Sequence, residues 1–236
     1  MHEIAKAELL RALGALVRGL SIVFWSLALT GLVCLGVVFI ETTETFWRET
    51  VSPLSFAPAL LPGPLLWFGL HRLGIFQAQE RIWQRALNRA EILAVLDAGL
   101  APFLFWWHRF PLVPLYTACV GLLFLCNLFL LIEINRVLQR LSAMLPDENL
   151  RGETKLFTNF NISVLLAFLG VLTTYYVLTL FPISKLPVWL DRWLQDAHAA
   201  GVWLALFLML VPLSMTMALL WKVKEVIFAS LTNAER

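Results

Sequence analysis

Charged residues are scarce in this chain of 236 residues, of which only 14% are Asp, Glu, Lys or Arg. A soluble domain carries about 25% charged residues, so the shortage argues against a protein that folds in water. The net charge of +2 is also too small to indicate a nucleic-acid-binding protein. Because no long polar segment interrupts the chain, we expect a single membrane domain over residues 1–236 and no separate soluble catalytic domain.

Paired cysteines and catalytic motifs are missing as well. Cys34, Cys119 and Cys126 all lie inside apolar segments, with neither the spacing of a disulfide framework nor a CxxC metal-ligand pair. The sequence contains no GxSxG, HExxH, Walker A or GxGxxG motif, and no carboxylate pair placed for acid–base chemistry. The sequence therefore predicts a protein that is not an enzyme and that has no cofactor or metal.

Hydrophobic residues make up 60% of the chain and gather in six segments. A transmembrane helix needs about 20 apolar residues to cross the hydrocarbon core. We therefore predict an all-α integral membrane protein whose six-span helical bundle forms one polytopic domain. The predicted spans are residues 20–40, 54–70, 92–107, 111–134, 162–181 and 202–221.

The second and third spans are the least regular of the six. The second contains Pro58, Pro62 and Pro64, and proline removes a backbone donor that lipid cannot replace. It is therefore expected to be either a kinked span shielded by its neighbours or a re-entrant loop. The third is short for a span, and includes Gly99 and Pro102. Two amphipathic segments, residues 4–20 and 185–200, are expected to form helices at the membrane surface.

The basic residues fall almost entirely into alternate connections between these segments. One set of connections and termini holds 14 of the 18 Lys and Arg residues. Short loops rich in Lys and Arg stay in the cytoplasm, so the sequence predicts an inner-membrane protein with both termini cytoplasmic. The other set holds only Arg48, Arg109, Lys185 and Arg192.

Asp97 is the first candidate for a functional residue, because it lies near the middle of the third predicted span. An ionised carboxylate at that depth costs about 2.5–3.5 kcal/mol on insertion scales, so it must face protein or water, pair with a donor, or stay protonated. One hypothesis is a proton- or cation-binding site in a broken helix. The alternative is a structural carboxyl group hydrogen-bonded to Asn127 or to a hydroxyl on a neighbouring span.

The remaining polar residues suggest less specific roles. Asn127 is expected to form an interhelical hydrogen bond, and together with Asp97 it makes up the candidate intramembrane polar site. Other polar residues near the inner span ends are interpreted as groups in the lipid headgroup zone: Glu91, Glu133, Asn135, Asn159 and Asn161. Arg81, Arg85 and Arg89 follow one another at helical spacing and are candidates for contact with anionic lipid headgroups.

Two functions from different classes fit this sequence, and a third fits less well. The first is a non-enzymatic subunit, scaffold or assembly component of a membrane complex, whose partners are lipids and other membrane subunits or further copies of itself. The second is a small ion- or proton-coupled transporter or channel that uses Asp97 and the broken second and third spans. An enzyme that acts on lipid at the membrane surface is the third. A water-filled path that reaches Asp97 would favour transport, whereas a dry bundle with an apolar outer groove would favour a subunit role.

Overall fold

The fold is described from a computed structural model, and it is all-helical in the part of the chain that the structure describes. That part comprises residues 2–42, 53–76, 79–110, 112–145, 148–180 and 188–235, with side chains described for 11–39, 56–76, 79–110, 112–145, 148–174 and 206–229. The elements, in order, are α1 His2–Thr42, η1 Pro53–Leu60, α3 Pro62–Leu73, α4 Arg81–Leu100, α5 Phe103–Arg109, α6 Pro114–Met144, α7 Glu148–Leu180 and α8 Val188–Glu235.

Five helical stretches are long and apolar enough to cross a membrane, which supports the prediction of a polytopic membrane protein. They are Arg11–Phe39, Arg81–Arg109, Pro114–Met144, Glu148–Thr174 and Leu206–Ala229. The predicted second span is not among them. Its place is taken by the 3-10 helix η1 and the 12-residue helix α3, which are separated at Leu61. The proline-rich segment is therefore broken, as the sequence predicts, because Pro58, Pro62 and Pro64 cannot supply the hydrogen bonds of one continuous helix.

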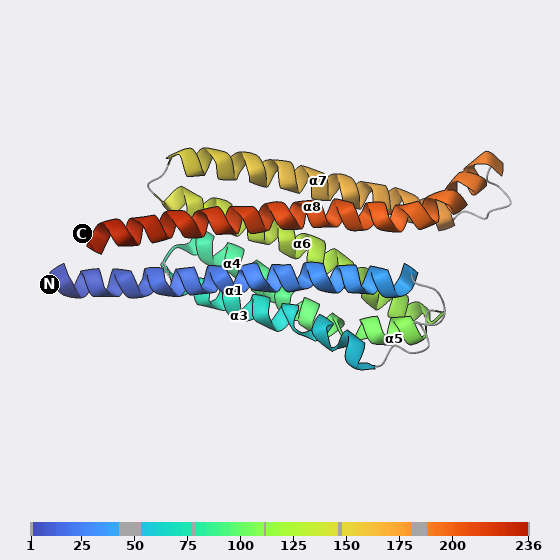
Figure 1. Cartoon of the computed structure of the whole chain (residues 1–236), viewed down its shortest axis with the longest axis horizontal. Coiled ribbons are helices and arrows are strands. Elements are labelled where there is room, and N and C mark those ends of the chain that lie inside the picture. The colour runs from blue at the N-terminus through green and yellow to red at the C-terminus, as the bar shows by residue number, and fades with distance from the viewer. Residues whose placement is uncertain are drawn as a thin grey trace.

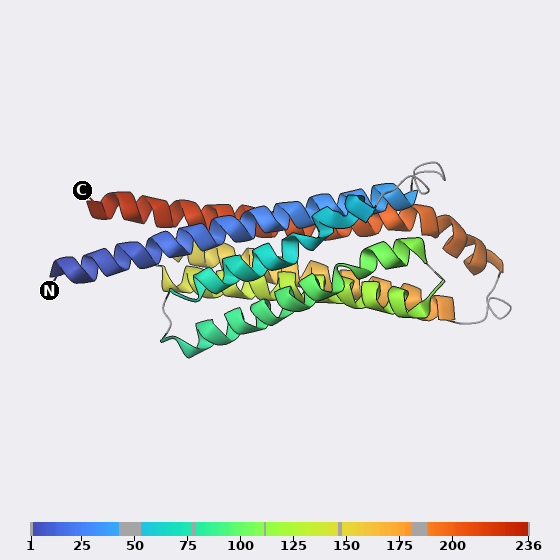
Figure 2. The same ribbon diagram turned by 90° about the horizontal axis from the view of Figure 1, so that it is seen from below.

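The helices lie along one another and alternate in direction (Figures 1 and 2). Helices α1, α4 and α7 run away from the end of the bundle at which α1 begins, and α3, α6 and α8 run back towards it (Figure 1). The end of α8 therefore lies beside the beginning of α1. We call this end of the bundle the basic end, because the connections predicted to be rich in Lys and Arg meet there, and the opposite end the far end.

Contacts between neighbouring helices close the bundle into a ring. Around the ring, α1 contacts α3, α3 contacts α4, α4 contacts α6, α6 contacts α7, α7 contacts α8, and α8 contacts α1. The helices therefore follow one another round the ring in chain order and alternate in direction (Figure 1). Helix α6 also contacts α8.

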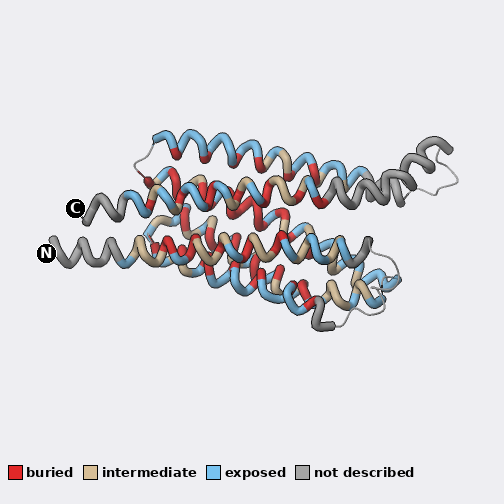
Figure 3. Tube along the Cα trace, in the orientation of Figure 1, coloured by how far each residue is buried: buried red, intermediate tan, exposed pale blue. Residues whose placement is uncertain are grey.

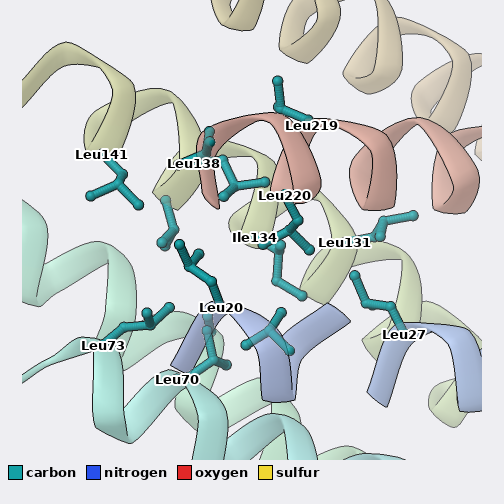
Figure 4. Packing of buried hydrophobic residues seen from close by; sticks show 14 of the residues in the cluster. Leu20, Leu27, Leu70, Leu73, Leu131, Ile134, Leu138, Leu141, Leu219 and Leu220 are labelled. Atoms are coloured by element: carbon teal, nitrogen blue, oxygen red, sulfur yellow. The ribbon is translucent and has the colours of Figure 1, made fainter. Parts of the chain in front are cut away.

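The half of the bundle nearer the basic end is tightly packed. Figure 3 shows that buried residues gather in the middle of the bundle and towards this end. Leucine side chains from several helices interlock there, including Leu20 of α1, Leu70 of α3, Leu138 of α6 and Leu220 of α8 (Figure 4). Leu138 and Leu220 are 1% and 2% exposed, so neither lipid nor water reaches this core.

Several predicted boundaries are wrong because helices continue through segments that were expected to end them. The expected surface helix over residues 4–20 is the first part of α1, and Leu16 and Leu20 are buried in the core. No proline separates this segment from the following apolar run, so the helix continues. Likewise, most of the segment 185–200 belongs to α8, which begins at Val188. Helix α7 begins at Glu148, before the expected start at residue 162.

Candidate functional site

Helix α4 directs Asp97 into the bundle through its own periodicity. The buried residues of this helix are Trp83, Leu87, Ala90, Ala94 and Asp97, which follow the three- and four-residue spacing of one helical face. Asp97 is therefore the last member of an otherwise apolar stripe, and it is only 5% exposed. The packing of the preceding residues of this face fixes the rotation of α4, and this rotation buries the Asp97 carboxyl group.

A glycine on the neighbouring helix brings α3 close to α4 beside this carboxyl group. A Cβ atom added to Gly63 would lie 2.7 Å from the backbone nitrogen of Ala98, a distance too short for any side chain. Gly63 stands near the start of α3, directly after the break at Leu61. The break and the close helix contact therefore lie next to Asp97.

Asp97 and Asn127 are brought together, 30 residues apart in the sequence. The Asn127 side-chain amide donates a hydrogen bond to the Asp97 carboxylate and a second to the carbonyl of Leu123 at 3.1 Å. No Lys, Arg or His among the described residues pairs with Asp97. The carboxyl group thus has one amide partner on α6 and no cation to balance its charge.

A cavity of about 520 Å³ opens next to this pair at the centre of the ring. Its volume lies within the range of about 300–1,000 Å³ that is typical of small-molecule sites. Side chains from every pass of the chain line it, and apart from Thr30, Asp97 and Asn127 they are apolar or nearly so. The lining residues include Thr30, Val33, Cys34 and Val37 of α1, Ala59 of η1, Pro62 of α3, Leu104 and Trp107 of α5, Phe124 of α6, Phe168 and Leu172 of α7, and Leu206 and Met209 of α8.

The helix that carries Asp97 is interrupted one turn beyond it. The backbone nitrogen of Ala101 still donates to the carbonyl of Asp97 at 3.0 Å, and then Pro102 interrupts the ladder before α5 begins at Phe103. Proline has no backbone donor, so the α4 helix ends where the cavity wall begins. Both broken segments of the chain, η1–α3 and α4–α5, therefore border the cavity.

A second polar cluster lies closer to the basic end, and it includes two asparagines that were expected at the membrane surface. Asn135 of α6 and Asn161 of α7 were interpreted as headgroup residues, but each is 1% exposed. Both amides donate to the Thr216 hydroxyl of α8 at 2.9 Å, and Asn161 also donates to the carbonyl of Pro212 at 3.1 Å. Thr216 itself donates to the carbonyl of Pro212 at 2.8 Å. We call these four residues the polar lock, because they join three helices.

A signal for the polar lock is present in the sequence. Pro212 and Thr216 lie four residues apart within the last apolar segment, so they share a helix face. The Thr216 hydroxyl can therefore reach the Pro212 carbonyl one turn before it, as threonine hydroxyls in helices commonly do. The two asparagines lie on other helices, and the sequence gives no distance between those helices.

The arginine stripe lies apart from the cavity. Arg81, Arg85 and Arg89 are exposed on the first half of α4, near the basic end. They are therefore placed where lipid headgroups would meet a membrane-spanning bundle. Within the described residues, no three His, Cys, Asp or Glu side chains lie close enough together to hold a metal ion.

Comparison with protein-family models, with curated proteins and with solved structures finds no match for this chain. We therefore infer the function from the residues around the cavity.

Proposed function

We propose that this protein is a small transporter that spans the membrane six times and uses Asp97 as a proton- or cation-binding carboxyl group. The observation that carries the proposal is the central cavity of about 520 Å³ beside a buried carboxylate that has no basic partner among the described residues. A carboxyl group with only a structural role needs no empty space beside it. A site that binds and releases a solute or an ion needs such a space.

Two further features support transport. Three spans followed by three would place the two halves of the chain in opposite orientations, as inverted repeats require, and transporters built from such repeats bind substrate near the bilayer midplane. In addition, η1–α3 and α4–α5 are broken helices beside the cavity. Interrupted helices at membrane depth are tolerated where they line a cavity.

The runner-up function is a subunit or scaffold of a membrane complex. It is supported by the many exposed apolar side chains on the helix exteriors, such as Leu32, Leu122 and Phe207. Lipid tails cover such surfaces as well as a protein partner does. A subunit role also gives no reason for the cavity at Asp97, so we favour transport.

The orientation follows from the distribution of basic residues. We propose that the basic end of the bundle faces the cytoplasm, with both termini there, and that the protein resides in the inner membrane. The arginine stripe Arg81, Arg85 and Arg89 would then contact the anionic headgroups of the cytoplasmic leaflet.

The test of the transport proposal is whether Asp97 exchanges protons. Infrared difference spectra between two pH values, recorded on the protein in lipid nanodiscs, report the carboxyl groups that gain or lose a proton. We expect a carboxyl band in the parent protein that is absent in Asp97→Asn and retained in Glu91→Gln, a matched change on the same helix. The titratable side chains that interact electrostatically with Asp97, Cys34 and Cys126, are thiols, so they do not absorb in the carboxyl region.

Two outcomes separate transport from a structural role. Asp97→Asn keeps the shape and the hydrogen bond to Asn127, so it should melt in detergent at an unchanged temperature while the band disappears. If the spectrum of Asp97→Asn superimposes on that of the parent protein, Asp97 does not exchange protons and the transport proposal is wrong.

A further inference from the structure

We propose that the central cavity binds a lipophilic amine, which enters from the bilayer between α1 and η1 and places its ammonium group against Asp97. This inference rests on the transport function proposed above and names its substrate class. Three observations carry it: the cavity holds hydrogen-bond acceptors without enough donors, its walls are otherwise apolar, and a surface groove adjoins it.

The cavity holds more hydrogen-bond acceptors than there are donors bound to them. Asp97 accepts one hydrogen bond, from Asn127, and the Asn127 carbonyl oxygen has no donor among the described residues. The Thr30 hydroxyl donates to the carbonyl of Ser26 at 2.9 Å, so its oxygen is left as an acceptor towards the cavity. A ligand that satisfies these acceptors donates hydrogen bonds, and a positive charge on it offsets the charge of an ionised Asp97. An ammonium group has both properties, because it offers N–H donors and no acceptor.

The remainder of the cavity wall fits the hydrocarbon part of such an amine. Val33, Val37, Leu172 and Leu206 line the cavity with branched aliphatic side chains. The rings of Phe124 and Phe168 also line it and meet edge to face, with their centroids 5.8 Å apart. Because most of this surface offers no hydrogen bond, a strongly hydrated solute such as a sugar or an amino acid would lose its water without replacement. An alkyl or aryl amine loses water only at its head group.

A groove on the bundle surface gives the amine a route from the lipid. A second hollow lies between α1 and η1, and it shares Val33, Val37 and Ala59 with the cavity wall. Its rim is open to the exterior, because Leu32 is 65% exposed and a Cβ atom added to Gly36 would meet no atom within 4 Å. The route that we infer for an amphiphile from the bilayer passes between these shared side chains and avoids the packed leucine core.

The first experiment tests the head group. Equilibrium binding of tritiated n-decylamine is measured on the protein in nanodiscs, with empty nanodiscs subtracted, and n-decanol and decanoate serve as competitors with the same chain. We expect saturable binding that neither competitor displaces. The dissociation constant should rise by about tenfold or more in Asp97→Asn, since the variant loses the ionic contact, and should not change in Glu91→Gln.

The outcomes for the amine and for the transport proposal are independent. If decylamine does not bind saturably, or if Asp97→Asn binds it as well as the parent protein, the substrate class is wrong even when Asp97 still shows its infrared band. If decanoate displaces the amine, the site does not select for positive charge and the inference is also overturned. Proton exchange at Asp97 is refuted, by contrast, if the parent protein shows no carboxyl band or if the band persists in Asp97→Asn, whether or not decylamine binds.

The second experiment tests the route. Gly36→Trp places an indole in the groove between α1 and η1, whereas Gly121→Trp adds the same ring to an exposed position of α6 that also has free space. Gly36→Trp should slow decylamine association by about tenfold, and Gly121→Trp should leave it unchanged. An association rate in Gly36→Trp equal to that of the control would exclude entry between α1 and η1.

Discussion

The two halves of the bundle treat buried polar groups in opposite ways. Near the basic end, Asn135, Asn161 and Thr216 bond to one another across three helices, and leucines fill the space around them. Towards the far end, Asp97 and Asn127 bond to each other but face an empty volume. Both sites contain polar residues inside a membrane bundle. The two sites differ in the space beside the polar groups. The first site joins three helices, and our proposal of a ligand site rests on the cavity beside the second.

The largest expected effect concerns which half faces the cytoplasm. A cysteine introduced at Arg109, the last residue of α5, should react with an impermeant thiol reagent in intact cells, and one at Asn149, at the start of α7, should not. The reason is that 14 of the 18 basic residues are predicted inside with Asn149. Labelling at Asn149 but not at Arg109 would show that the far end of the bundle, and not the basic end, faces the cytoplasm.

The next effect compares two leucines on the same helix. Leu138→Ala opens a void in the packed half and should lower the free energy of unfolding by about 2–5 kcal/mol. Leu123→Ala only enlarges the existing cavity, so it should cost clearly less, although Leu123 is itself buried. Unfolding in mixed detergent gives both values. Equal losses would mean that the far half is packed as tightly as the basic half.

A smaller effect distinguishes two of the buried threonine hydroxyls, one at each polar site. Thr216→Val removes the acceptor shared by Asn135 and Asn161, and should cost about 0.6 kcal/mol and at most about 1.7 kcal/mol, the average and the maximum measured for interhelical hydrogen bonds. Thr30 donates only to its own helix, so Thr30→Val should leave the unfolding free energy nearly unchanged. The same unfolding assay is used. A cost for Thr30→Val as large as that for Thr216→Val would show that the cavity hydroxyl also joins helices.

The smallest effect concerns the two surfaces of the bundle. Arg85→Gln should weaken the binding of anionic lipid by at most about 1 kcal/mol, because Arg85 is exposed in the arginine stripe near the basic end. Arg109→Gln, a matched change at the far end, should have less effect. Native mass spectrometry with phosphatidylglycerol measures both. A greater loss for Arg109→Gln would contradict the assignment of the stripe to the cytoplasmic leaflet.

Helix periodicity explains why part of the site could be predicted. The spacing of Trp83, Leu87, Ala90, Ala94 and Asp97 is visible in the sequence, and it places the carboxyl group on the buried face of α4. The proline pattern likewise indicates a break in the second apolar segment, and the structure shows that break at Leu61. Each of these inferences uses residues within one helix, where the geometry is fixed.

The predictions are wrong where the burial or the hydrogen-bond partner of a residue depends on a second helix. Asn135 and Asn161 stand near the ends of predicted spans, and only the packing of α6, α7 and α8 shows that they point at Thr216. The boundaries of α1 and α7 were misplaced for a related reason, since apolar residues beyond the predicted spans find burial against neighbouring helices.

By itself the sequence determined that this protein folds in a membrane, and which face of α4 is buried. A chain with 60% hydrophobic and 14% charged residues folds as apolar helices, and the periodicity of α4 selects the face on which Asp97 lies. The sequence offered Asn127 or a hydroxyl as the partner of Asp97, and the tertiary structure selected Asn127. The tertiary structure alone decided that Thr216 joins two asparagines and that a cavity remains at the centre of the ring. The physical reason is that a hydrogen bond or an empty volume between helices depends on distances that periodicity does not contain.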